Sequence, residues 1–329
     1  MQTTNQWGRK ARRWAFALLA CSAGAVFAQD YPNRPVTLVV PFPPGGITDV
    51  SARLVAKTLA EDLKQPVVVE NRPGAGASIG AGIVAKAPAD GYTLLVGTLA
   101  NIVVNSYVYK EALPYKPQAD FTPVHGTMAL PLVVVAKGNS PFKTFPAMVE
   151  HARANPGKLT YGSAGVGSVA HLAAELMQGQ SKVQLVHVPY KGSAQAITDL
   201  IGGNTDMAFD YASSTAPHIQ SGKLTALAVT GPARLPGLPD VPTVAEAGFP
   251  ATEVTSWIGI FAPAATPQAA VDTLSAALGR VMANKEVGDA ITAAGGTVFP
   301  LKPAEFKTFI ESEHKRWQPI IERLDIKAN

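Results

Sequence analysis

Two glycine-rich loops are the places in this chain where residue types and spacing suggest chemistry. The first, residues 41–49, follows an apolar run and contains three prolines and two glycines before Thr48 and Asp49. Prolines stiffen such a loop, glycines let its backbone approach a ligand, and Thr48 or Asp49 can cap the helix expected next. Free amides at a helix start bind anions. We therefore expect an anion site here, formed by Phe42, Pro44, Gly45, Gly46, Thr48 and Asp49.

The second loop, residues 162–168, has the same layout with hydroxyl groups added, and leads into a segment that carries His171 and Glu175. Either loop alone also fits an ordinary strand-to-helix turn. Two such loops facing one cleft favour an anion-binding site formed between them. The candidate residues of the second loop are Ser163, Gly165, Gly167, Ser168 and His171.

Enzymatic alternatives for the second loop are weaker. Residues 165–170 fit G-x-G-x-x-A, but the next strand ends in His187 rather than in the ribose-binding acid of a dinucleotide site. No G-x-S-x-G motif surrounds Ser163 and no Walker A loop is present. A secreted hydrolase using Ser163 or Ser168 with His171 remains the alternative hypothesis.

A metal site is also considered at the second loop. His171 and Glu175 lie one helical turn apart and could share a metal ion, but no H-E-x-x-H motif or cysteine cluster accompanies them. A contact on the helix surface is the favoured interpretation of this pair. No metal and no cofactor are expected.

Aromatic residues near strand ends are further candidates. Phe42, Tyr190, Phe209 and Trp257 fit this description, and Asp210 follows Phe209 directly. Packing in the core is the simpler interpretation of Phe209 and Trp257. If these rings line the cleft, they enclose an apolar or aromatic part of the ligand.

Short apolar runs alternate with amphipathic segments along the chain, which is typical of parallel sheets covered on both faces and predicts an α/β fold. The expected strands are 36–40, 67–70, 93–97, 132–136, 159–161, 184–187, 205–210 and 224–230. The expected helices are 49–63, 146–154 with Thr144 as N-cap, 168–178, 193–201, 267–283 and 303–324.

No flexible linker separates two domains, so we expect two interleaved lobes. Residues 121–136 and 253–263 are extended enough to cross between them. This predicts one lobe of residues 30–129 plus 255–329 and a second of residues 130–254. Ligands in such sheets bind in the crevice at the carboxyl ends of the strands.

Residues 1–28 have the order of a secretory signal peptide, with four basic residues, a short apolar run and a predicted cleavage site after Ala28. A lipid anchor at Cys21, the only cysteine, and a twin-arginine signal at Arg12 and Arg13 fit less well. The four basic residues account for the whole net charge of +4, so the exported protein is neutral and nucleic acid is excluded as a partner. No run of about 18 uncharged apolar residues occurs, which excludes a multi-pass membrane protein.

Eight segments in order, spread over nearly the whole exported chain, resemble the Bug-type (TctC-like) solute-binding proteins, the periplasmic receptors of tripartite tricarboxylate transporters. They are residues 41–49, 69–76, 89–95, 121–124, 155–159, 187–192, 238–248 and 263–267.

The resemblance implies a type II periplasmic-binding-protein fold, whose two lobes close on a small carboxylate delivered to membrane permease subunits. In this family, backbone amides and waters of two loops hold the carboxylate, which corresponds here to residues 44–49 and 163–168. This chain departs from the family at Thr98 and Leu99, and at 128–131, where it is more apolar. A mono- or dicarboxylate with an aromatic or aliphatic body is therefore expected, bound by a monomer. A sensor that presents its closed form to a signalling partner is a further alternative.

Overall fold

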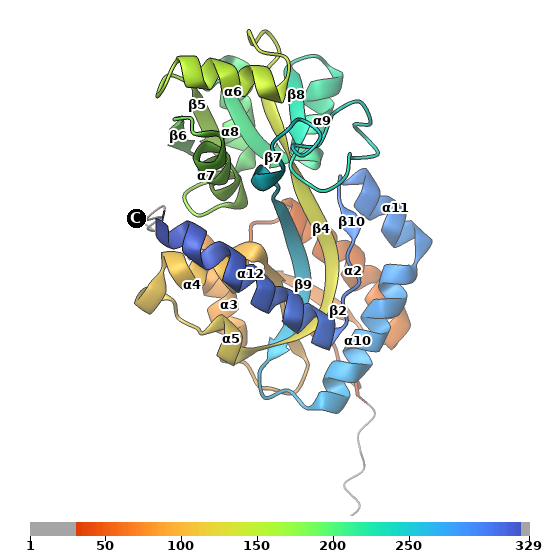
Figure 1. Cartoon of the computed structure of the whole chain (residues 1–329). Coiled ribbons are helices and arrows are strands. Elements are labelled where there is room, and N and C mark those ends of the chain that lie inside the picture. Colours follow the sequence, from red (N-terminus) through yellow and green to blue (C-terminus); the bar gives the residue numbers. More distant parts are fainter. Residues whose placement is uncertain (1–30, 324–329) are drawn as a thin grey trace, which may run out of the picture. The chain divides into compact units, whose positions relative to one another are not determined.

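The computed structural model describes residues 31–323, and the chain from Arg34 onward belongs to one compact unit (Figure 1). The predicted signal peptide, its cleavage site and Cys21 lie outside the described residues. The strands are β1 Val36–Val40, β2 Val67–Asn71, β3 Thr93–Thr98, β4 Phe121–Lys137, β5 Thr160–Ser163, β6 Val186–Pro189, β7 Met207–Tyr211, β8 Leu224–Val229, β9 Thr255–Pro263 and β10 Thr297–Val298. The longer helices are α2 Ile47–Leu63, α3 Ser78–Ala85, α6 Phe145–Ala154, α7 Val169–Ser181, α8 Ser193–Gly202, α9 Ala212–Gln220, α10 Gln268–Ala283, α11 Lys285–Ala293 and α12 Pro303–Arg323. The short ones are α4 Asn105–Val108 and α5 Pro117–Asp120.

All ten strands form one mixed sheet in the order β2-β1-β3-β9-β4-β7-β5-β6, with β8 and β10 also paired to β4. The strands that lead into the glycine-rich loops lie in parallel groups, β1 with β2 and β3, and β5 with β6 and β7. The predicted parallel pairing is found only within these two groups, because β4, β8, β9 and β10 pair antiparallel to their neighbours. The carboxyl ends of each parallel group still share one edge.

Strand β4 joins the two parallel groups. Its first part, from Phe121 to Pro131, pairs with β9, and from Leu132 onward it pairs with β7 and β8. In Figure 1, β4 runs beside β9 and continues past β7. The chain therefore passes between the two groups within regular strand structure along β4.

Strands β4 and β7 are packed on both faces, since side chains alternate along a strand and both sets are covered. Val134 and Phe209 face a core that includes residues of α6 and α7, whereas Val133 and Ala208 face a core that includes residues of α8. This explains the uninterrupted apolar run of residues 132–136. Helix α6 starts at the predicted cap, since the Thr144 hydroxyl accepts a bond from the Ala147 amide at 3.3 Å.

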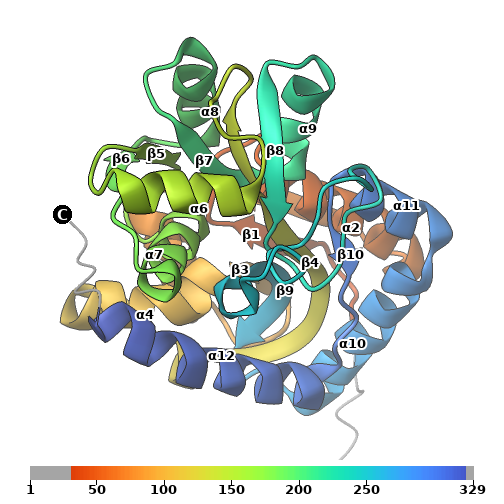
Figure 2. The ribbon, with the colours of Figure 1, turned by 45° about the horizontal axis from the view of Figure 1, so that its top comes forward.

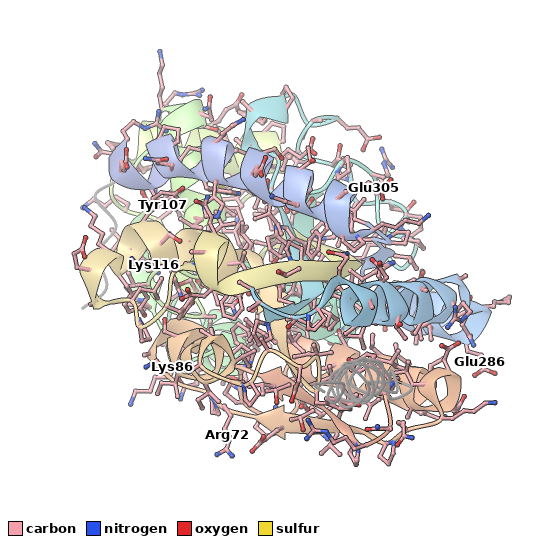
Figure 3. All side chains as sticks on the ribbon, turned by 90° about the horizontal axis from the view of Figure 1, so that it is seen from below. Arg72, Lys86, Tyr107, Lys116, Glu286 and Glu305 are labelled. Atoms are coloured by element: carbon pink, nitrogen blue, oxygen red, sulfur yellow. The ribbon has the colours of Figure 1, made fainter. Side chains whose placement is uncertain are left out.

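Helix α12 packs on β4 and on the turn Ala100–Val104, and it contacts β9 through Trp257 (Figure 2). Figure 3, a view from below, shows Tyr107 next to α12. Its hydroxyl oxygen is 2.8 Å from Nδ1 of His314, a residue of that helix. Within residues 31–323, no helix is both long enough and apolar enough to cross a membrane.

Candidate functional site

Loop 1, residues 41–46, connects β1 to α2 and is exposed from Pro43 to Gly46. Helix α2 begins at Ile47, and its N-cap is Gly46, which supplies no capping side chain. The prediction that Thr48 or Asp49 caps this helix was therefore wrong. Among the described residues, no side chain accepts the amides of Ile47 and Thr48, so the helix start keeps free donors. This is the arrangement that binds an anion.

Asp49 fixes the shape of loop 1 from inside the first turn of α2, where it is 3% exposed. Its carboxylate accepts the Gly45 amide at 2.9 Å and the Asn71 side-chain amide at 2.8 Å. The same Asn71 nitrogen donates to the Phe42 carbonyl at 3.1 Å. Burial favours the neutral acid, but the bonds from Arg53, Gly45 and Asn71 outweigh it and lower the pKa of Asp49. The carboxylate thus holds the loop rather than facing solvent.

Loop 2, residues 163–168, connects β5 to α7 and is held by side chains on both sides. The Ser163 hydroxyl accepts the Gly165 amide at 3.1 Å, and His171 Nδ1 accepts the Gly167 amide at 3.1 Å. Ser168 is the N-cap of α7 and accepts the His171 amide at 3.2 Å. Because these amides are already bonded, the donors left without an acceptor among the described residues include that of Val166 in the loop and those of Val169 and Ala170 at the start of α7.

Three rings, Tyr161, His187 and His171, are stacked behind loop 2, and we call them the ring stack. The centroids of Tyr161 and His187 are 4.8 Å apart, and those of His187 and His171 are 4.1 Å apart. Tyr161 also donates its hydroxyl to Glu175 at 2.7 Å. Burial lowers the pKa of His171 to about 4, and burial together with His171 lowers the pKa of His187 to about 4. Both imidazoles are therefore neutral near pH 7.

The ring stack changes two interpretations of the sequence. His171 is 8% exposed and the Glu175 side chain is 23% exposed, so their contact at 3.9 Å is partly buried rather than at the open helix surface. Ser163 contacts His187 Nε2 at 2.7 Å, and Ser168 accepts the backbone amide of His171, so neither serine named for a hydrolase is hydrogen-bonded to the His171 imidazole. Ser163 is also 1% exposed, which closes it to a substrate.

The end of β3 completes this region. Thr98 donates its amide to the Asn101 side-chain oxygen at 2.7 Å, and Leu99 is fully buried. The π-helical turn Ala100–Val104 and then α4 follow. Val108 of α4 reaches loop 2, since a Cβ placed on Gly167 would lie 3.9 Å from both of its methyl carbons. Because β3 pairs with β1, this contact brings loop 2 to the strand group that carries loop 1.

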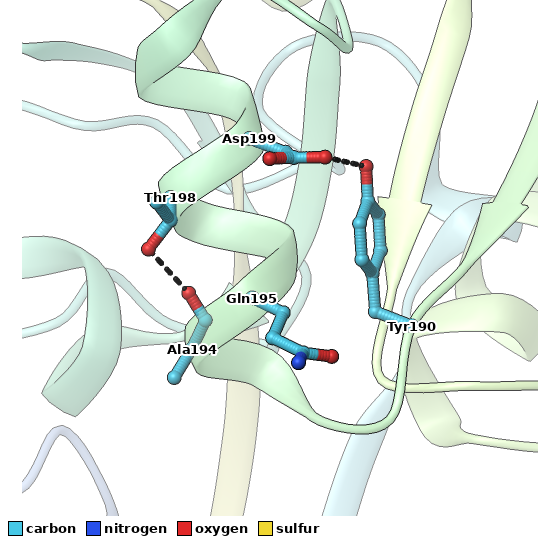
Figure 4. A pocket seen from close by; sticks show the side chains of 5 residues that line it. All are labelled: Tyr190, Ala194, Gln195, Thr198 and Asp199. Carbon is cyan, nitrogen blue, oxygen red and sulfur yellow. Dashed lines mark hydrogen bonds between the residues drawn. The ribbon is translucent and has the colours of Figure 1, made fainter.

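Tyr190 lies beyond loop 2, where its hydroxyl donates to Asp199 at 2.7 Å (Figure 4). The two side chains line a surface hollow of about 460 Å³ together with Ala194, Gln195 and Thr198. The Tyr190 amide donates to the Ser163 carbonyl at 3.0 Å. Tyr190 therefore supports loop 2 through its backbone and faces α8 with its ring.

Phe209, Asp210 and Trp257 are buried. Phe209 is 2% exposed and packs edge-on against Tyr161. Trp257 is 1% exposed and donates its indole N–H to Glu313 of α12 at 3.1 Å. The Asp210 carboxylate accepts bonds from Ser193 at 3.0 Å and from the Tyr211 amide at 2.7 Å, at the starts of α8 and α9. Burial raises the pKa of Asp210 to about 6.

Residues that the sequence did not single out hold the site together. Asn71 belongs to the Val-Glu-Asn-Arg-Pro-Gly segment, where only family resemblance drew attention to it. Tyr161 and Val108 gave no signal because their roles depend on contacts between distant segments. Across residues 31–323, no group of three histidine, cysteine or acidic side chains is placed to hold a metal ion.

Neither loop contains lysine or arginine, and Arg53, the cation beside loop 1, is bonded to Asp49 and Asn71. The groups left to attract an anion are the free amides and the dipoles of α2 and α7. Such a site suits a small monoanionic group such as a carboxylate.

The fold is that of the periplasmic binding proteins, as the sequence predicted. Rpa4515 of R. palustris, solved with adipate, has a TM-score of 0.84 at 35% identity, with 91% of this chain and 100% of that chain covered. MatC of Rhodopseudomonas palustris, solved with malate, has a TM-score of 0.78 at 34% identity over 88% of this chain and all of that one. The periplasmic binding protein BugD has a TM-score of 0.80 at 33% identity over 91% of this chain and 100% of that one.

Residues 51–326 match the family model for the tripartite tricarboxylate transporter family receptor. The chain belongs to this family. It is 40% identical to the UPF0065 protein in the tcbD-tcbE intergenic region of Pseudomonas sp. (strain P51), over 96% of this chain and 94% of that protein. It is 36% identical to protein BugT of Bordetella pertussis, over 95% and 96%. The resemblance found in the sequence is thus confirmed.

Proposed function

We propose that this protein is an exported receptor that captures a small mono- or dicarboxylate and delivers it to the permease subunits of a tripartite tricarboxylate transporter. The observation that carries the proposal is the start of α2, where loop 1 is exposed, the N-cap has no side chain, and the amides are free. Two relatives above 30% identity were solved with the dicarboxylates adipate and malate, which supports this ligand class.

The carboxylate would lie between loop 1 and loop 2, with the α2 amides on one side and those of Val166, Val169 and Ala170 on the other. Residues 30–129 plus 255–329 would form one lobe and 130–254 the other, closing by a hinge where β4 and β9 cross between them. Thr48 and Thr98 would supply polar contacts. Phe42, Leu99, Tyr190, Phe209 and Trp257 would shape the apolar surroundings, and the buried Leu99, Phe209 and Trp257 would act from within the core.

The proposal also covers export and assembly. The leader would be removed after Ala28, leaving a periplasmic monomer without a lipid anchor. We propose no catalytic activity, because Ser163 is buried and no carboxylate among residues 31–323 hydrogen-bonds to its partner His187.

A thermal-shift screen on the exported protein tests the ligand class. It compares adipate, malate and aromatic monocarboxylates with their uncharged amides at equal concentration. A carboxylate at 100 times its dissociation constant adds about 2.7 kcal/mol to the free energy of unfolding, whereas the matching amide adds none. Shifts with amides or sugars but with no carboxylate would reject the proposal.

A further inference from the structure

His171 occupies an unusual position for a helix residue near a ligand loop, because its ring contacts the loop instead of solvent. Its Nδ1 accepts the Gly167 amide at 3.1 Å, so the ring must carry its proton on Nε2. Gly167 has a φ of +76°, which glycine adopts easily and other residues do not. The imidazole therefore fixes a flexible point in the middle of loop 2.

Protonation would reverse this contact. A charged imidazole carries hydrogen on both nitrogens, so Nδ1 would point a hydrogen at the Gly167 N–H and repel it. His187, stacked 4.1 Å away, would add to the cost of the charge. Glu175, at 3.9 Å from Nε2, is the neighbour that would favour the charged ring. Its Oε1 atom already accepts hydrogen bonds from Tyr161 and Gln178.

Among residues 31–323, the other charged groups against α7 are Arg153, which donates to the Ser181 carbonyl, and Arg323 beside Gly179, and as cations at the far end of the helix they do not offset a positive charge on His171. Strand β5 contributes Tyr161, β6 contributes His187, and β7 turns Phe209 to this side while Asp210 points to the α8 side. The turn Pro250–Thr252, which packs on α7, carries no titratable side chain, and α4 presents Val108 to Gly167.

We propose that His171 is a positioning residue for loop 2, which holds the loop in its binding shape only while the imidazole is neutral, so that acid loosens the loop and releases the ligand. The hydrogen bond between Gly167 and His171 is present in the structure, whereas the release of a carboxylate rests on the proposed function. The low pKa of His171 keeps the loop fixed at neutral pH.

Two substitutions separate the hydrogen bond from the titration. In His171→Asn, the side-chain oxygen can replace Nδ1 as acceptor but cannot be protonated in this range. In His171→Leu, the acceptor is lost. At pH 7.5, we expect His171→Asn to bind the best carboxylate of the screen within about threefold of wild type, and His171→Leu to bind about tenfold more weakly.

The pH profile is the decisive readout, measured by calorimetry on the exported protein. Half of His171 is protonated near pH 4, so the wild-type dissociation constant should rise about twofold more than that of His171→Asn between pH 7.5 and pH 4.0. The asparagine variant also corrects for titration of the ligand. Equal profiles, or tighter wild-type binding in acid, would overturn the inference.

A measurement without ligand keeps this test separate from the proposed function. The Gly167 amide resonance in a ¹⁵N-labelled sample should titrate with the His171 ring in wild type and stay fixed in His171→Asn. If no carboxylate binds but the resonance titrates, the proposed function fails while the role of His171 in the loop stands. A Gly167 resonance that does not shift as the His171 ring is protonated would show that His171 does not position loop 2.

Discussion

The imidazole rings of His171 and His187 are nearly parallel, with planes 9° apart and centroids separated by 4.1 Å. One ring comes from α7 and the other from β6, and each contacts a residue of loop 2. The stack therefore links the stability of the protein to the shape of its candidate ligand loop.

We expect the free energy of unfolding to fall in acid because of this stack. Both folded-state pKa values, about 4, lie below the ordinary 6.5, so the unfolded chain binds more protons between these values. The stabilisation from the two neutral imidazoles is complete above pH 6.5. It is lost as the pH falls toward and through 4, which lowers the free energy of unfolding by on the order of 2 to 4 kcal/mol. Urea unfolding at several pH values measures it. His187→Gln should flatten the profile; parallel profiles would argue against the stack as the cause.

Replacing Asp49 should loosen loop 1. In Asp49→Ala, the Gly45 and Asn71 donors lose a buried charged acceptor, and we expect a loss of about 2 to 3 kcal/mol in stability together with weaker carboxylate binding. Arg53→Ala is the matched control, because its half-exposed ion pair with Asp49 should contribute less than about 1 kcal/mol. Chemical unfolding and calorimetry measure both. Equal effects of the two variants would assign the role to the ion pair instead.

Glu313 should stabilise the fold as a hydrogen-bond acceptor, and its negative charge should not be needed for this. It is 5% exposed and accepts the indole N–H groups of Trp257 at 3.1 Å and Trp317 at 3.3 Å. Burial raises its pKa, so its ionised form lowers stability as the pH rises through the folded value. Glu313→Gln should change stability by less than about 1 kcal/mol at pH 7, whereas Glu313→Ala should cost about 2 to 4 kcal/mol. A larger loss in the glutamine variant would show that the charge is needed.

The sequence predicted the elements whose residues follow a clear pattern. Apolar runs located β1 to β3, and helical spacing located α2, α10 and α12 to within a few residues. Helix α3 was missed because its residues are small or apolar on every side, and α9 because it is polar and contains Pro217. The antiparallel course of β4 and β9 depends on pairing between distant segments, which no local pattern encodes.

The candidate site was predictable at the level of its loops and not of its contacts. The glycines marked both loops correctly as strand-to-helix connections. The cap of α2 was misplaced because Asp49, a good capping residue, lies inside the helix and reaches back to Gly45. The ring stack was not foreseen, since His171 and His187 meet only when β6 pairs with β5 and α7 packs against that sheet.

Substitution of Gly46 tests whether free amides at the start of α2 hold the carboxylate. Its backbone is extended at φ −75°, and a Cβ there would meet only the Pro43 carbonyl oxygen, at 3.7 Å, so other residues fit without strain. Gly46→Ala controls for size and Gly46→Asn for capping without charge, while Gly46→Asp puts a carboxylate where the ligand's own is expected.

Calorimetric titration of these three variants with the best carboxylate of the screen is the most direct measurement. We expect Gly46→Ala to bind within about threefold of wild type, Gly46→Asn to bind more weakly, and Gly46→Asp to lose at least about a hundredfold in affinity with an unchanged or higher melting temperature. Wild-type affinity in a folded Gly46→Asp protein would contradict this expectation.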